Sequence, residues 1–353
     1  MSVSDINSRT HDSLLANFTY NSVLNFPRLA EEAKRGDISL SALPNVYNPT
    51  NPIPALIIGS GPSLDDMIDV LPRWRGAIFA SPTNLMNLEA VGRPPHYICI
   101  TDSDPVDSKY LRGHLSPDSV LLTHQCVDPE LLDAWIGPKR YFKFFRDDMI
   151  WNNIQTALFP YLQVTMGGIG CVSNTMVQIA DFLGYRPIIL MGVDFGPVDG
   201  RIRAKEYDRG GAYRLKPLPA RTVDHTDPSV YEFYYHSFFT IWKLIASGMR
   251  SKGWVLSCSK GMLKELPQVT KEQMINLQFP EAMEPKAIMD LCDSVTIPAG
   301  MYADIVPPGG VKYAESAKAQ VIGLKNAVKQ AESEADRWHK TEDGVWSYTP
   351  RKQ

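Results

Sequence analysis

Short runs of consecutive apolar residues recur along the first 270 residues of the chain. In the clearest run, Ala55–Ile58, four apolar residues, two of them β-branched, predict a strand buried on both faces, as in parallel sheets. Similar runs lie at residues 76–81, 96–101, 119–124, 140–145, 187–194 and 254–258. Because helix-compatible segments separate the runs, the pattern predicts an α/β fold, a Rossmann-like, doubly wound, mostly parallel sheet over residues 51–270. We expect the strands that end at Ile58, Ala80, Thr101 and Val193 to be neighbours in its middle.

Helical spacing of apolar residues follows several of these strands. It predicts one helix after the first strand, over residues 64–71, and another over residues 172–183 that stops at Gly184. A third helix is predicted over residues 229–252, with Thr226 or Asp227 as its N-cap.

The two ends of the chain lie outside this pattern. Residues 1–50 form a predicted N-terminal lead-in segment with one or two helices between residues 14 and 30. Residues 271–353 form a predicted C-terminal extension with a long helix, residues 311–338, whose small and apolar residues recur at coiled-coil spacing. Such a helix packs either on its own domain or against a second copy of the chain, which leaves a homo-oligomer open.

Composition narrows the class of protein. The net charge of -3 and pI of about 6.2 do not indicate a nucleic-acid-binding protein. No apolar stretch approaches the roughly 20 residues that span a membrane. The five cysteines are scattered without zinc-site spacing, as expected of reduced thiols. Together with an N-terminus that lacks the pattern of a signal peptide, this predicts a cytoplasmic protein.

A glycine-rich turn, Gly59-Ser60-Gly61, joins the first strand to the predicted helix. Glycines let a backbone approach a ligand closely, and unpaired N–H groups at the start of a helix bind phosphate. The turn lacks the third glycine of the usual dinucleotide motif, so an ordinary tight turn is the alternative. A second glycine-rich loop, from Gly167 to Gly170, precedes the helix predicted over residues 172–183 and offers another anion site.

Polar residues collect where the predicted strands end. They are Asn84, Asp102, Asp104, His124 and Asp194. Ligands of open α/β sheets bind at these carboxyl ends, although turns favour Asn and Asp in any case.

A long basic loop, residues 196–224, follows Asp194 and suits a phosphate-bearing ligand, or is a solvated insertion. His225 comes directly after it, at the predicted start of the third helix. A histidine there is a candidate general base, because its pKa lies close to neutral pH.

Several of these motifs resemble the 6-hydroxymethylpterin diphosphokinase MptE-like family, which is related to motility-accessory-factor flagellin glycosyltransferases and to bacterial lipooligosaccharide sialyltransferases. The resemblance covers about residues 45–270. It is carried by the segments at residues 57–64, 102–105, 167–174, 183–195 and 258–263, and by His225.

The resemblance implies a role for individual residues. It places the donor nucleotide on two loops and at the ends of two strands. The implied nucleotide-binding residues are Gly59, Ser60, Gly61, Pro62, Ser63, Asn84, Asp102, Gly167, Gly168, Ser173 and Asn174. It also implies Asp194 and His225 as catalytic residues, with His225 the general base.

Two reactions and one non-catalytic function are compatible with these residues. The first is transfer of a sugar from a nucleotide-sugar donor to a hydroxyl acceptor. The second is transfer of pyrophosphate from ATP to a hydroxymethyl-pterin-like alcohol, with Mg²⁺ held by Asp104 and Asp194. The third is a nucleotide-binding module without catalysis. The additional segments at both ends favour sugar transfer.

Overall fold

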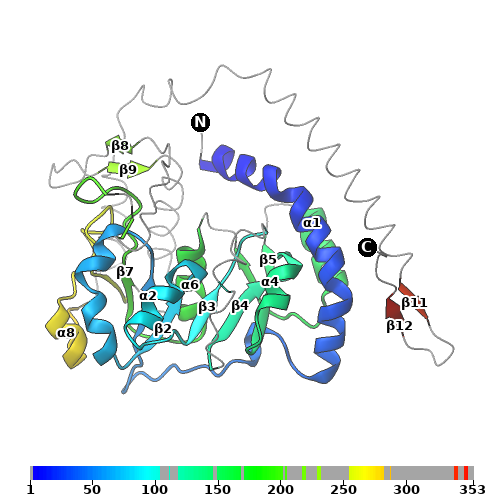
Figure 1. Ribbon diagram of the computed structural model, residues 1–353, viewed down its shortest axis with the longest axis horizontal. Coiled ribbons are helices and arrows are strands. Elements are labelled where there is room, and N and C mark those ends of the chain that lie inside the picture. The colour runs from blue at the N-terminus through cyan, green and yellow to red at the C-terminus, as the bar shows by residue number, and fades with distance from the viewer. Residues whose placement is uncertain are drawn as a thin grey trace, which may run out of the picture.

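The computed structural model describes residues 3–103, 111, 118–145, 149–167, 171–201, 203–204, 217–219, 229–231, 254–281, 287, 338–340 and 346–348. Its centre is an eight-stranded sheet in the order β10-β7-β1-β2-β3-β4-β5-β6, and all of its pairs are parallel (Figure 1). The strands are β1 (Ala55–Ile58), β2 (Ala77–Ala80), β3 (Tyr97–Cys99), β4 (Val120–His124), β5 (Lys139–Phe145), β6 (Thr165–Gly167), β7 (Ile188–Met191) and β10 (Val255–Ser257). The predicted fold class is therefore confirmed, and so is the adjacency of β7, β1, β2 and β3.

Alternate residues of the strands enter two separate hydrophobic cores, one on each face of the sheet. In β1, Ala55 and Ile57 belong to one core and Leu56 and Ile58 to the other. Helix α6 (Val172–Phe182) covers the first face. Residues of α1 (Val3–Arg35), α2 (Leu85–Ala90), α4 (Pro129–Ala134) and α8 (Lys271–Asn276) pack on the second. Burial on both faces explains why the strands have continuous apolar sequences.

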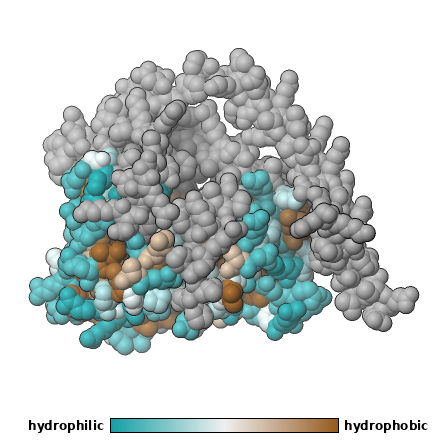
Figure 2. Space-filling view, in the orientation of Figure 1, coloured by the Kyte–Doolittle hydropathy of each residue, from teal (hydrophilic) through white to brown (hydrophobic). Residues whose placement is uncertain are grey.

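The lead-in segment contains one long helix, α1, where the sequence indicates one or two shorter ones. In Figure 1 it runs past β5 and α4 at one end of the sheet, whereas α8 lies at the other end. Polar contacts fix α1 in place: the Asn25 amide donates to the carbonyls of Gln125 and Val127, and Asn21 donates to Ser103 and Cys126. In the view of Figure 2, hydrophilic residues cover most of the described surface, with hydrophobic patches between them.

One helix prediction is corrected, and two others are corrected at one end only. The segment after β1 forms two 3₁₀ helices, η2 (Pro62–Asp66) and η3 (Ile68–Arg73), and Pro72, inside η3, cannot donate a backbone hydrogen bond that would continue an α-helix. Ser229–Tyr231 is strand β9, paired with β8 (Pro217–Pro219), so the third helix does not begin at Ser229, and its predicted N-cap and residues 232–252 lie outside the described residues. Trp338 begins strand β11 (Trp338–Lys340), which pairs with β12 (Trp346–Tyr348), and the rest of the helix predicted over residues 311–338 lies outside the described residues.

The remaining described elements are short. They are η1 (Leu40–Ala42), η4 (Pro82–Asn84) and α5 (Met149–Leu158). Within the described part of the chain, no helix is both long enough and apolar enough to cross a membrane.

Candidate functional site

The order of the strands reverses beside β1. From β1 to β6 each strand lies on the same side of its predecessor, and the chain then returns through α6 to place β7 on the other side of β1. At such a switch point the connections leaving the two central strands turn to opposite faces, which opens the crevice where α/β proteins bind ligands. In this protein the switch point lies at the carboxyl ends of β1 and β7, where Gly59–Ser63 and Gly192–Asp194 meet.

The loop after β1 packs directly against the loop after β7. The Gly59 N–H donates to the Met191 carbonyl and the Gly61 N–H to the Gly192 carbonyl, both at 2.8 Å. A Cβ on Gly59 would lie 2.3 Å from the Gly192 oxygen, and one on Gly61 would lie 2.3 Å from Asp194 Oδ2. Gly192 itself has φ +66°, in the left-handed region. The glycines are therefore required for the contact between the two loops.

Asp194 is the centre of this contact. Asp194 is only 2% exposed, and its carboxylate connects the loops after β1, β7 and β10. Oδ2 accepts a hydrogen bond from the Ser63 N–H at 2.9 Å, and Oδ1 accepts from Ser63 Oγ at 2.6 Å. Oδ1 also accepts from the N–H groups of Lys260 and Gly261, in the loop after β10. Gly261 approaches so closely that a Cβ would lie 2.1 Å from the Asp194 carbonyl oxygen.

Burial raises the pKa of Asp194 above its ordinary value of 3.8, although its hydrogen bonds with Ser63, Gly261 and Lys260 act in the opposite direction. Both oxygens already accept N–H or O–H donors, so the carboxylate does not fit the part of a Mg²⁺ ligand. In the described part of the chain no group of three His, Cys, Asp or Glu side chains is arranged to hold a metal. The geometry supports Asp194 as the residue that positions the three loops.

The backbone donors of the first glycine loop are mostly used within the protein. Gly59, Gly61 and Ser63 donate to Met191, Gly192 and Asp194, and Pro62 has no N–H. The helix that follows, η2, has five residues and is 3₁₀. The expected phosphate cradle of free N–H groups at a helix start is thus replaced by a loop that is tied to β7.

Asn84 stands at the next strand end. Its Nδ2 donates to the Ile58 carbonyl at 3.0 Å and to Ser81 Oγ at 3.1 Å, which joins the end of β1 to η4. Asn84 is fully buried, and no described group donates to its Oδ1. Asn84 therefore belongs to the switch point, one strand away from Gly59. Asp102, after β3, is exposed.

Gly167, the described residue of the second glycine loop, is farther from this position. Gly167 ends β6, which is five strands from β1 in the sheet, a distance of about 24 Å at about 4.8 Å per strand. Ser173 and Asn174 lie in the first turn of α6, and Asn174 is fully buried. The structure therefore brings together Gly59–Ser63, Asn84 and Asp194, and it places Gly167 apart from them.

Three of the predicted site residues lie outside the described part of the chain. They are Asp104, Gly168 and His225, the last in the connection between β8 and β9. His124, another candidate from the strand ends, is a buried histidine. Its Nδ1 accepts from the Cys126 N–H, its Nε2 donates to the Thr101 carbonyl, and burial lowers its pKa to about 4. His124 is thus neutral and structural.

Two ion pairs lie at the switch point. Arg201 belongs to the basic loop over residues 196–224 that suits a phosphate-bearing ligand, whereas Lys260 and the two carboxylates were not singled out from the sequence. Lys260 Nζ lies 2.9 Å from Asp66 Oδ2, and Arg201 forms an ion pair with Asp65. The Ala204 N–H, near Arg201, donates to the Ser60 carbonyl at 3.1 Å. The Ser-Lys-Gly sequence after the last core strand was the available signal for Lys260, but its partner is 194 residues away in the chain (260 − 66).

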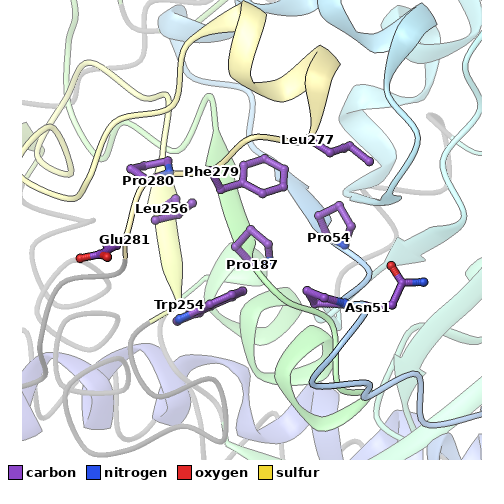
Figure 3. A pocket seen from close by; sticks show the side chains of 10 residues that line it. Asn51, Pro54, Pro187, Trp254, Leu256, Leu277, Phe279, Pro280 and Glu281 are labelled. Atoms are coloured by element: carbon purple, nitrogen blue, oxygen red, sulfur yellow. The ribbon is translucent and has the colours of Figure 1, made fainter.

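A separate cleft of about 390 Å³ opens at the opposite ends of the strands. Figure 3 shows Pro54, Pro187 and Trp254, which precede β1, β7 and β10, facing Phe279 and Leu277 across it. Asn51 and Glu281 lie at its ends. The cleft lies at the amino ends of the strands, so it is not part of the switch-point site.

Comparison with known proteins agrees with this architecture. Residues 28–200 match the family model described as 6-hydroxymethylpterin diphosphokinase MptE-like, which confirms the resemblance seen in the sequence. No curated protein matches the chain. A solved structure of a MAf glycosyltransferase from Magnetospirillum magneticum AMB-1 is similar, with a TM-score of 0.50 and 18% identity. The match covers 80% of this chain and 44% of that one, so it concerns less than half of the larger protein and shows a shared fold.

Proposed function

Because residues 28–200 are MptE-like, we propose that this protein is a nucleotide-dependent transferase that moves a sugar from a nucleotide-sugar donor to a hydroxyl acceptor. The observation that carries the proposal is the convergence of the loops after β1, β7 and β10 around Asp194 at the switch point of the sheet. The family description names a diphosphokinase, which is a transferase, and the similar solved structure is that of a glycosyltransferase.

In this proposal the residues have distinct tasks. Gly59–Ser63 and Asn84 form the wall against which the nucleotide lies, and Asp194 holds that wall in position through Ser63. His225 is the proposed general base that removes the proton of the acceptor hydroxyl as the sugar transfers, while the nucleotide leaves with its phosphate. Asp102, Gly167, Gly168, Ser173 and Asn174 remain proposed contacts for the rest of the donor.

The second candidate is the reaction named in the family description, pyrophosphate transfer to a hydroxymethylpterin. It is the weaker proposal for this chain, because the Asp194 oxygens are occupied by protein donors and do not fit the Mg²⁺ that ATP brings.

The test begins with thermal shifts. CMP-, UDP- and GDP-sugars are compared with ATP plus Mg²⁺, and a ligand present at about 100 times its Kd stabilises the protein by roughly 2.7 kcal/mol. The sugar that stabilises the protein is then incubated with it, and release of free nucleotide to water or to an added alcohol is followed by chromatography. ATP with Mg²⁺ as the only stabilising ligand would favour the second candidate, and no shift with any of them would overturn both.

The His225→Ala variant separates chemistry from binding. A general base contributes about 10²–10⁴ to turnover, so we expect nucleotide release to fall by that factor while the thermal shift with the donor stays as in the wild type. Unchanged turnover would exclude His225 as the base.

A further inference from the structure

We propose that Arg201 and Lys260 form a phosphate subsite beside the Gly59–Ser63 loop, and that this subsite takes the diphosphate of a nucleotide. The inference rests on the proposed function, because it places the nucleotide at the switch point. It goes beyond that function by naming the phosphate chemistry of the donor.

The first glycine loop lacks the free N–H donors expected of a phosphate site. A phosphate needs hydrogen-bond donors or positive charge around it. At the first glycine loop the N–H groups of Gly59, Gly61 and Ser63 donate to the protein. Charge near the loop must therefore come from side chains, and in this part of the described chain Arg201 and Lys260 supply it.

Lys260 and Arg201 both lie beside the Gly59–Ser63 loop. Lys260 lies in the loop whose N–H groups bind Asp194, and Asp194 in turn binds Ser63. Arg201 is three residues from Ala204, whose N–H donates to the Ser60 carbonyl. Backbone contacts thus hold the segments of both cations against the loop that forms the wall of the site. Arg201 lies in the connection after β7, and Lys260 lies in the loop after β10.

The side chains of both ion pairs are accessible to solvent. The side chains of Lys260 and Asp66 are 55% and 46% exposed, and those of Arg201 and Asp65 are 30% and 20% exposed. The Lys260–Asp66 pair is exposed, and such pairs contribute little to stability, whereas the Arg201–Asp65 pair is part-buried. A phosphate group can therefore replace Asp66 as the partner of Lys260 at small cost to the fold, and the several N–H donors of the Arg201 guanidinium allow it to bind a phosphate beside Asp65.

The number of cations can be compared with the number of phosphate groups in the ligand. Two cations from two loops match two phosphate groups, and the guanidinium of Arg201 suits bidentate contact with phosphate oxygens. A donor with a single phosphate would leave one cation with its aspartate. The arrangement therefore favours nucleoside diphosphates over monophosphates.

The experiment measures binding by isothermal titration calorimetry at low ionic strength. The probes are the mono- and diphosphates of adenosine, cytidine, guanosine and uridine, together with inorganic pyrophosphate. We expect at least one diphosphate to bind about tenfold or more tightly than its monophosphate, since a charge-assisted hydrogen bond is lost with the second phosphate. Arg201→Gln and Lys260→Gln should each remove most of that difference and leave monophosphate binding nearly unchanged.

The ion pairs offer matched controls. Lys271 forms an equivalent exposed pair with Asp69, at 2.7 Å, on the neighbouring η3, and Lys271→Gln should leave all affinities unchanged. Asp66→Asn should tighten diphosphate binding, because it frees Lys260 and removes a repelling charge. If the pair served the fold alone, Asp66→Asn and Lys260→Gln would change binding in the same direction.

The outcomes separate the subsite from the function. Nucleotide binding that is indifferent to the second phosphate, or to both cations, overturns the subsite and leaves the proposed function standing. Pyrophosphate binding that depends on both cations, without binding of any nucleotide, supports the subsite and overturns the proposed function. An equal loss in Lys271→Gln attributes the effect to net charge and overturns the subsite.

Discussion

Replacing Gly61 by alanine tests whether the glycine loop is held by β7 or is free for a ligand. The new Cβ would lie 2.3 Å from Asp194 Oδ2 and 2.7 Å from the Gly192 oxygen. The carboxylate has to move away, and it then loses a hydrogen bond with Ser63, worth about 1.5–3 kcal/mol for a charged acceptor. Crowding against the Gly192 backbone adds about 1–3 kcal/mol. We therefore expect the free energy of unfolding to fall by about 2.5–6 kcal/mol.

The assay is equilibrium unfolding in urea, followed by circular dichroism, with Gly36→Ala as the matched control. A Cβ on Gly36 would meet no atom within 4 Å, so this variant should stay within about 1 kcal/mol of the wild type. If Gly61→Ala is as stable as Gly36→Ala, the close contact between the loops is refuted. If it is as stable and also loses nucleotide binding, the loop approaches a phosphate as the sequence motif alone suggests.

Two further predictions concern buried polar groups. Asp194→Asn should change the pH dependence of stability: because the folded-state pKa of Asp194 is raised, the wild type gains stability as the pH falls through that value towards 3.8, and the variant does not. The free energy of unfolding of the wild type minus that of Asp194→Asn should therefore increase from pH 7 to pH 4. A decrease of this difference over the same range would contradict the raised pKa. Asn25→Ala should cost about 1–3 kcal/mol in thermal or urea unfolding, because the Gln125 and Val127 carbonyls lose their donor, whereas exposed Asn17→Ala on the same helix should have little effect; equal stability of the two variants would exclude a role of Asn25 in fixing α1.

Strand prediction succeeded where burial on both faces leaves a local signal. Runs such as Ala55–Ile58 and Ile188–Met191 are apolar throughout because each face of the sheet is covered. Strand β6 was missed, since Thr165–Gly167 has three residues, one of them exposed, at the edge of the sheet. The helix after β1 was assigned the wrong type because apolar spacing does not distinguish α from 3₁₀ over so short a segment.

The sequence alone determined the strands of the parallel sheet and the positions of Gly59, Gly61 and Asp194 at strand ends, because these depend on short-range patterns; it also predicted that β7, β1, β2 and β3 are neighbours, but not their order. The tertiary structure decided what those residues do. Ser63 and Asp194 are 131 residues apart, and Lys260 is 66 beyond Asp194, so only the pairing of β1, β7 and β10 brings them into contact. The pairing of β1 through β5 with β6 places Gly167 five strands from Gly59 and Gly61, although the two glycine-rich segments look alike in sequence. A glycine signals a close approach of the backbone, and only the folded chain shows that its neighbour here is another loop of the protein.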